Sequence, residues 1–175
     1  MQREATAAFP DLLHLGSATG FVGEIHEVVN TLALFEGFTL LDCSVLCEYM
    51  ACFAAPGHAT LLTEDTVGDF LVIILTGSVD VVKAAGPGQQ KVVAHIGPGG
   101  FLGEMSLIDG KQRFASCISI QPTDFAVLTR EALSQILADH PQLGSKVLLL
   151  LLQLMTGRLR DAVTKMLPTI EGEWL

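Results

Sequence analysis

A glycine-rich loop, one glutamate and one arginine form the clearest chemical pattern in this sequence. Residues 96–103 are IGPGGFLG, Glu104 follows directly, and Arg113 lies nine residues further on. Glycines let backbone amides approach a ligand, and the first amides of a helix bind anions because they have no partner inside it. A guanidinium matches a phosphate, whereas an ionised carboxylate accepts hydrogen bonds from sugar hydroxyls. The pattern predicts a site for a phosphorylated sugar, although ordinary loop charges would have the same spacing.

The glycines do not match a dinucleotide-binding loop. Their spacing differs from G-x-G-x-x-G, and the surrounding pattern predicts no βαβ unit. Beyond Met50 the chain instead shows short apolar runs bounded by Gly, Pro or Asp, which predict strands. We expect these strands at residues 59–62, 70–75, 78–83, 91–96, 116–120 and 124–128. So many short strands indicate an antiparallel sandwich or barrel.

Two short helices are expected before the strands. The first 20 residues have no sustained period, so we expect a loose arm with one helical turn. Apolar residues at helical spacing then predict helices over residues 23–35 and 41–49. Glu24 would lie in the first turn of the earlier helix, where the helix dipole favours an anion.

Two further helices are expected after the last strand. Thr129 is a suitable N-cap, and the helix that it starts should end near His140 because Pro141 cannot continue it. Pro141 suits the first turn of a final helix, which we expect to run to about residue 166 before Pro168 ends it.

The final helix carries a very apolar stretch, VLLLLLQLM, at residues 147–155. Five consecutive leucines leave no polar face for two turns, so the helix needs cover on both sides. One side can pack on the β-rich domain, and we expect the other to contact its symmetry mate in a homodimer through residues 141–166. The 11 uncharged residues between Lys146 and Arg158 are too few for the ~20 of a membrane-spanning helix, so no membrane association is expected.

The charge balance argues against nucleic-acid binding. The chain has 10 Lys and Arg residues against 19 Asp and Glu, which gives a formal net charge of -9. Nucleic-acid binding relies on clustered cations that replace counterions on phosphates, so no nucleic-acid partner is expected. The N-terminus lacks a basic region followed by an apolar core, so no signal peptide is predicted and a cytoplasmic location is expected.

The cysteines and histidines predict no metal centre. Cys43, Cys47 and Cys52 have the spacing C-x3-C-x4-C, which matches no zinc or iron-sulfur pattern, so we expect reduced, packed thiols. A metal enzyme on a small barrel, such as a cupin, would need clustered ligands, whereas the five histidines are scattered. No Ser-His-Asp or Cys-His arrangement is evident, so we predict no catalytic residue and no enzyme activity.

One stretch resembles a known motif. GFLGEMSLIDGKQRFAS, residues 100–116, is similar to the phosphate-binding cassette of cyclic nucleotide-binding domains, the family of cAMP-dependent kinase regulatory subunits, cyclic-nucleotide-gated channels and catabolite activators. The family pattern is F-G-E-(apolar)-(small)-L, followed by an arginine and a small-residue pair before a strand. It is met by Gly103, Glu104, Met105, Ser106, Leu107, Arg113, Ala115 and Ser116. The resemblance covers about residues 35–166.

The resemblance implies roles for individual residues. Arg113 would pair with the cyclic phosphate, and Glu104 would accept from the ribose 2′-hydroxyl. The implied ligand-binding residues are Gly103, Glu104, Met105, Arg113, Phe114, Ala115 and Ser116. The last helix of the family closes over the base, which nominates Thr156, Gly157 and Arg158. Phe114 stands where cGMP-selective members often have a threonine, so cAMP is favoured over cGMP.

The resemblance also implies a fold that is mainly β. We expect an antiparallel β-roll of the jelly-roll type with N-terminal helices and a long C-terminal helix. The expected divisions are an arm and helix (1–34), the β-roll (35–128) with its cassette (97–116), lid and dimerisation helices (129–167) and a tail (168–175). The expected function is a non-catalytic, regulatory sensor of cAMP, or of cGMP, that needs no cofactor and signals through its last helix.

Two other functions remain open at this stage. The chain could be a dimerisation module of the same fold that binds no ligand. It could also be a transcription-regulator relative that has lost its helix-turn-helix, because only KMLPTIEGEWL follows Thr164. That segment is acidic and too short for two helices.

Overall fold

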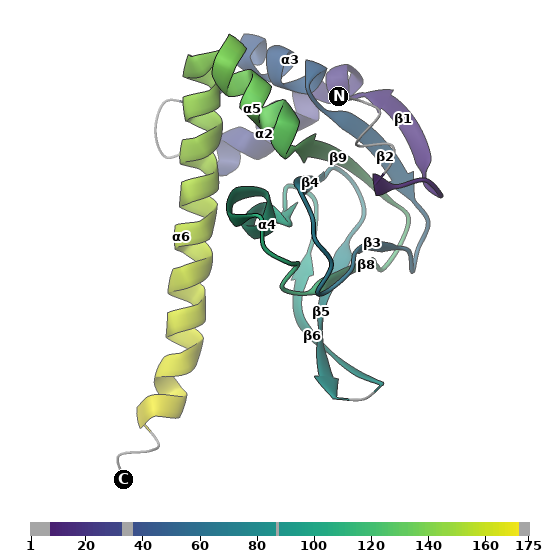
Figure 1. The fold of residues 1–175 in the computed structure, drawn as a ribbon, viewed down its shortest axis with the longest axis vertical. Coiled ribbons are helices and arrows are strands. Elements are labelled where there is room, and N and C mark those ends of the chain that lie inside the picture. Colours follow the sequence, from purple (N-terminus) through teal and green to yellow (C-terminus); the bar gives the residue numbers. More distant parts are fainter. Residues whose placement is uncertain (1–7, 33–36, 87, 172–175) are drawn as a thin grey trace.

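The computed structural model describes residues 8–32, 37–86 and 88–171, and this part of the chain holds nine strands (Figure 1). The strands are β1 (Leu13–Ser17), β2 (Ala51–Ala55), β3 (Thr60–Leu62), β4 (Phe70–Ile74), β5 (Val79–Gly86), β6 (Gln89–Ile96), β7 (Phe101–Leu102), β8 (Ser116–Ser119) and β9 (Thr123–Thr129). They form two antiparallel sheets, one in the order β1-β2-β9-β4-β7 and one in the order β3-β8-β5-β6. The predicted β-roll with flanking helices is confirmed.

Most of the helices gather on one face of the five-stranded sheet (Figure 1). The helices are η1 (Ala18–Phe21), α2 (Val22–Leu32), α3 (Leu40–Glu48), α4 (Glu104–Asp109), α5 (Arg130–Asp139) and α6 (Pro141–Glu171). The long α6 starts beside α5 and runs down one side of the roll (Figure 1). Among the described residues, no helix combines the length and the apolar character that a bilayer span requires.

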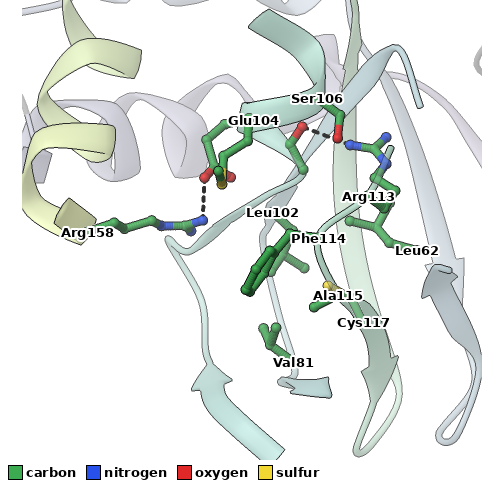
Figure 2. A pocket seen from close by; sticks show the side chains of 12 residues that line it. Leu62, Val81, Leu102, Glu104, Ser106, Arg113, Phe114, Ala115, Cys117 and Arg158 are labelled. Carbon is green, nitrogen blue, oxygen red and sulfur yellow. Dashed lines mark hydrogen bonds and ion pairs between the residues drawn. The ribbon is translucent and has the colours of Figure 1, made fainter. Parts of the chain in front are cut away.

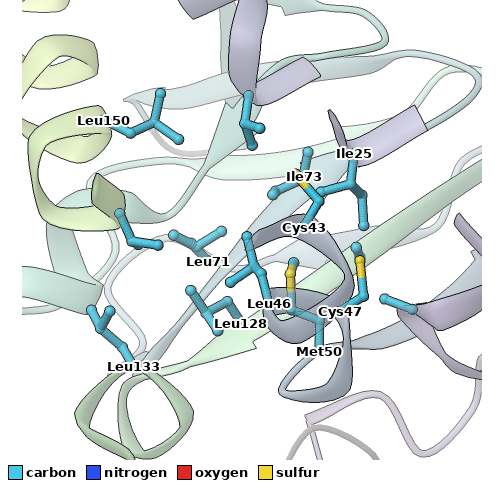
Figure 3. Close-up of a cluster of buried hydrophobic side chains, with 14 of the residues drawn as sticks. Ile25, Cys43, Leu46, Cys47, Met50, Leu71, Ile73, Leu128, Leu133 and Leu150 are labelled. Atoms are coloured by element: carbon cyan, nitrogen blue, oxygen red, sulfur yellow. The ribbon is translucent and has the colours of Figure 1, made fainter. Parts of the chain in front are cut away.

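The central strands are apolar on both faces because two cores cover them. In β4, Leu71 and Ile73 belong to the core shared with the helices, whereas Val72 and Ile74 belong to the core between the sheets. Successive side chains of a strand point to opposite faces, which produces this alternation. Figure 3 shows the helix-side core, where Leu150 of α6 is also buried. The same core therefore joins the roll to its C-terminal helix.

Thiols form part of this helix-side core (Figure 3). Cys43, Cys47 and Cys52 are buried and unpaired. Burial raises the pKa of Cys43 to about 11 and the pKa values of Cys47 and Cys52 to about 12. In the described ranges, no group of three or more His, Cys, Asp or Glu residues is placed to hold a metal ion.

The N-terminal region is more regular than predicted. Residues 13–17 form β1, which pairs with β2, and η1 follows at once. The expected loose arm is therefore wrong for residues 13–17, whereas the expected single helical turn is present as η1. Residues 1–7 lie outside the described part. The pairing partner is distant in the sequence, so no local pattern indicates it. The strand β2 was also not predicted, because its sequence ACFAA is apolar throughout and shows no period of two.

Among the described residues, the helix predictions agree with the structure except at the end of α6. The predicted end of the first helix, residues 33–35, lies outside the described part. Thr129 is the N-cap of α5, and its hydroxyl accepts from the Ala132 amide at 3.1 Å. The predicted stop near residue 166 is wrong, because α6 continues through Pro168 to Glu171. A proline removes one hydrogen bond, but extending an existing helix is far easier than starting one.

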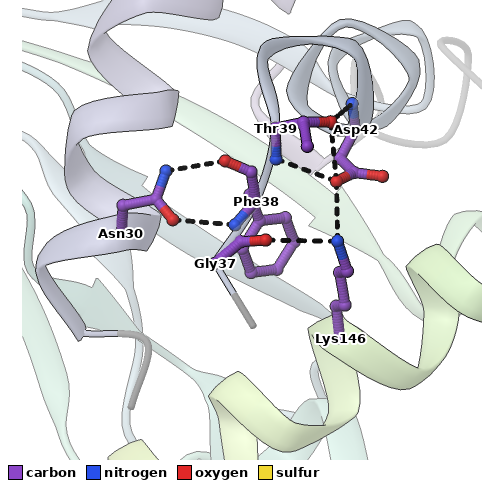
Figure 4. A network of polar contacts seen from close by, with 6 residues as sticks. All are labelled: Asn30, Gly37, Phe38, Thr39, Asp42 and Lys146. Carbon is purple, nitrogen blue, oxygen red and sulfur yellow. Dashed lines mark hydrogen bonds and ion pairs between the residues drawn. The ribbon is translucent and has the colours of Figure 1, made fainter. Parts of the chain in front are cut away.

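A polar network fixes the start of α6 against α3 (Figure 4). Lys146 Nζ lies 2.8 Å from Asp42 Oδ2 and donates to the Gly37 carbonyl at 3.1 Å. Asp42 and Thr39 also form the capping box of α3. Burial raises the pKa of Asp42, but hydrogen bonds from Lys146 and Thr39 outweigh this effect and hold the pKa below its ordinary value. The Asp42 carboxylate therefore caps α3 and also binds Lys146 of α6.

Candidate functional site

Within the cassette, the helix α4 starts at Gly103, a position where any other residue would be strained. Gly103 follows β7 as the N-cap of α4 and has φ +77°. L side chains rarely adopt this conformation. A Cβ at Gly103 would also collide with Nη1 of Arg113. The position therefore needs glycine both for its backbone angle and for the guanidinium beside it.

Arg113 is a buried cation held by backbone carbonyls. The residue is only 3% exposed. Its Nη1 donates to the Gly103 carbonyl at 2.8 Å, and its Nη2 donates to the Phe70 carbonyl at 2.7 Å. The pairing of β7 with β4 brings these carbonyls together. Burial lowers the pKa of Arg113, and neighbouring Asp69 and Glu104 oppose this shift. No carboxylate of the described residues lies within ion-pair distance, so the buried charge has hydrogen bonds but no anion.

Glu104 has one bound and one free carboxylate oxygen (Figure 2). The residue is 1% exposed, and Oε1 pairs with Nη1 of Arg158 from α6. Nη2 of Arg158 donates to the Phe101 carbonyl. The other oxygen of Glu104, Oε2, is buried and has no hydrogen-bond partner among the described residues. Leaving a buried acceptor unpaired costs about 1–3 kcal/mol, so this atom indicates a place for an external donor.

These charged groups line a single pocket that opens to solvent (Figure 2). Its empty space, which includes part of the open solvent at its mouth, is about 420 Å³. One end is polar and holds Glu104, Arg113 and Arg158. One carboxylate and two guanidiniums give that end a single net positive charge, which suits a ligand with one negative charge. The remaining wall is mostly apolar and contains Leu62, Val81, Leu102, Phe114, Ala115 and Cys117. Burial raises the pKa of the Cys117 thiol to about 12, so this wall is uncharged at neutral pH.

The predicted site residues divide into two groups. Those that line the pocket are Gly103, Glu104, Met105, Arg113, Phe114, Ala115 and Arg158. Those outside the lining are Ser116, Thr156 and Gly157. The Ser116 hydroxyl accepts from the Glu64 amide at 2.9 Å, and the Thr156 hydroxyl donates to the Leu152 carbonyl at 2.8 Å. The helix α6 thus reaches the pocket through Arg158, at the carboxylate end.

Apart from Phe114 and Ala115, sequence reasoning missed the apolar wall, and it also missed one cation beside the wall. Lys83 on β5 donates to the Phe114 carbonyl at 2.6 Å, and its Nζ lies 4.5 Å from the centroid of the Phe114 ring. Strand alternation could have indicated that Val81 faces the inside of the roll, since it lies two residues from the buried Val79. No local signal connects Lys83 with Phe114, because they lie on separate segments.

A match to a protein-family model identifies the family of this domain. The model for the cyclic nucleotide-binding domain matches residues 53–140, which is half of the chain and includes the whole cassette. The chain belongs to the cyclic nucleotide-binding domain family. A solved cyclic nucleotide-binding domain from Methylobacillus flagellatus KT is similar to this domain over 92% of this chain and 90% of that chain, with 49% identity and a TM-score of 0.86.

Longer proteins contain regions similar to this cyclic nucleotide-binding domain. The solved catabolite activator protein of Thermus thermophilus has 26% identity and a TM-score of 0.66, over 76% of this chain and 61% of that chain. The CRP-like cAMP-activated global transcriptional regulator of Mycobacterium tuberculosis is 27% identical over 134 residues. That match covers 77% of this chain and 58% of the regulator. The domain therefore spans little more than half the length of the curated relatives that it matches.

Proposed function

We propose that this domain binds a cyclic nucleotide, with cAMP preferred over cGMP, and acts as a sensor without catalysis. One observation carries the proposal: a single pocket holds a buried carboxylate and a buried guanidinium. Within the described part of the chain, one oxygen of the carboxylate has no partner and the guanidinium has no anion. A ribose 2′-hydroxyl would donate to Oε2 of Glu104, and the singly charged cyclic phosphate would meet Arg113. The cAMP named in two curated relatives supports the choice of base.

Calorimetric titration with cAMP and cGMP tests this proposal. Arg113→Ala should weaken cAMP binding by about 30-fold or more, because truncating one partner of a buried charge pair typically costs about 2–5 kcal/mol. Arg160→Ala is the matched control, since Arg160 is exposed on α6 and outside the pocket. Unchanged affinity in Arg113→Ala would refute the phosphate assignment. A domain that binds neither nucleotide would instead be a dimerisation module of the same fold.

We assign sensing to residues 35–128 and output to residues 129–167, with Arg158 as the link between them. Arg158 holds Oε1 of Glu104, while Oε2 is left for the sugar. The ribose and α6 would both contact the Glu104 carboxylate. Nucleotide binding would therefore favour the position of α6 in which Arg158 contacts Glu104. In hydrogen exchange, cAMP should slow exchange around residues 155–160 in the wild type. Arg158→Met should still bind cAMP but lose this effect.

The helix α6 would also join two copies of the chain through residues 141–166. Its exposed apolar residues are Leu148, Leu149, Leu152, Leu159, Val163 and Met166. Leu152, Leu159 and Met166 are spaced by seven residues, as in the contact positions of coiled coils. They lie on the side of the helix opposite to Leu150 and Leu143, which are buried in the core. This exposed apolar stripe supports a second copy of the same helix as its partner.

A further inference from the structure

Phe114 presents an unusually exposed aromatic ring at the pocket. The residue is 64% exposed although the ring lines the pocket beside Leu102 and Val81 (Figure 2). A phenylalanine gains nothing from contact with water, so a free aromatic face at a ligand pocket indicates a contact with another flat, apolar group.

The ring is held in place from β5. Lys83 donates to the Phe114 carbonyl at 2.6 Å and also lies against the ring, 4.5 Å from its centroid. The same ammonium pairs with Glu64, which in turn accepts from the Ala84 amide at 2.9 Å. The hydrogen bond from Lys83 lowers the pKa of Glu64, which favours the carboxylate form that pairs with the ammonium. A cation against one face leaves the opposite face of the ring for a ligand.

We propose that Phe114 is a stacking platform for the nucleotide base and that Lys83 is its positioning residue. This inference rests on the proposed cyclic nucleotide binding and specifies how the base is recognised. Every base has a π-face and can stack on an aromatic ring. We expect the two-ring purines to stack more strongly on Phe114 than the one-ring pyrimidines, because they bring more aromatic surface into contact. On the pocket side of the ring, Val81 and Leu102 form an apolar wall. Guanine has more polar edge atoms than adenine to leave unpaired there, which agrees with a preference for cAMP.

The purine preference can be measured by calorimetric titration with cAMP, cGMP, cCMP and cUMP, which share the same sugar and phosphate. The wild type should bind the two purine nucleotides roughly tenfold more tightly than the two pyrimidine nucleotides. Phe114→Leu keeps an apolar side chain but loses the ring, so the purine preference should fall to within about threefold. Phe114→Tyr keeps the ring and should retain the preference. Both changes affect an exposed side chain, and a thermal melt checks that each variant is folded.

The variant Lys83→Met tests whether Lys83 positions the Phe114 ring or attracts the nucleotide phosphate. If Lys83 acts through the ring, this variant should narrow the purine preference and weaken cAMP and cGMP binding more than cCMP binding. Equal weakening of all four nucleotides would show that Lys83 acts on the phosphate and would overturn its positioning role. An unchanged purine preference in Phe114→Leu would overturn the stacking platform alone. If the wild type binds none of the four nucleotides, the proposed function itself fails.

Discussion

At the scale of single residues, the two oxygens of Glu104 have separate partners. Oε1 pairs with Arg158, and Oε2 has no partner among the described residues. Glu104→Gln keeps the size of the side chain but removes its charge. We expect cAMP affinity to fall by about tenfold or more, because hydrogen bonds to charged groups contribute about 1.5–3 kcal/mol. 2′-Deoxy-cAMP serves as the control ligand in the same titration. It should bind wild type weakly, and the wild-type advantage of cAMP over it should shrink in the variant.

Gly103 allows a second test at this scale. Gly103→Ala places a Cβ at φ +77° against the Arg113 guanidinium, so it should lower the free energy of unfolding by about 1–2 kcal/mol and weaken cAMP binding together. Gly157→Ala is the matched control. Its Cβ would meet no atom within 4 Å, and alanine favours a helix, so stability should rise by up to about 1 kcal/mol with binding unchanged. Urea unfolding measures the stability of each variant, and calorimetry measures its cAMP affinity. Equal stability and equal affinity in the two variants would contradict the requirement for glycine at position 103.

The sequence predicts the polar end of the pocket better than its apolar wall. Glu104 and Arg113 lie in one short cassette, where spacing alone brings them into a single loop. The contact between Glu104 and Arg158 depends on the direction of α6, which no local pattern determines. The contact between Lys83 and Phe114 depends on how β5 lies beside the cassette. Pairwise contacts between distant segments are therefore the part of the site that needs the structure.

At the scale of elements, the pair formed by Lys146 and Asp42 joins α6 to α3. Lys146→Met should lower the free energy of unfolding by about 1 kcal/mol, because the pair is only partly exposed. The pKa of Asp42 is lower in the folded protein than its ordinary value of 3.8. The contribution of Asp42 to stability is therefore present above pH 4 and is lost as the pH falls through the folded pKa.

Urea unfolding at several pH values tests this contribution. The difference between wild type and Lys146→Met should be largest near neutral pH and should shrink below about pH 4. Lys91→Met, at an exposed position of β6, provides the control for loss of a lysine. A difference between wild type and Lys146→Met that stays constant down to pH 2 would exclude the Asp42 pair as its cause.

Elements were predicted where the pattern is local and missed where pairing defines them. The caps of α5 follow from Thr129 and Pro141, so its limits agree with the structure. The strand β1 has an apolar alternation of only three residues, Leu13 to Leu15, and its pairing with β2 defines it. Proline at position 168 predicts a helix end, yet α6 is long enough to continue past it. Local sequence signals thus predict most helix ends, whereas a strand such as β1 depends on its pairing partner.

At the scale of the whole molecule, the exposed apolar stripe of α6 should decide the assembly. Leu152→Lys combined with Leu159→Lys places charges at two contact positions and should convert a dimer into a monomer. Sedimentation equilibrium measures this directly. Thr164→Lys, on another side of the same helix, is the control and should remain dimeric. A wild type that is monomeric at high micromolar concentration would contradict the proposed dimer.

The far end of α6 has a further consequence for this assembly. Residues 159–166 are exposed on every side within the described chain, so the domain itself gives them almost no tertiary support. An isolated helix shorter than ~12–15 residues is only marginally stable in water. The far end of α6 should therefore fold when two copies meet and unfold when they part. The helical content of the protein then becomes a function of its concentration, and circular dichroism on dilution would report association.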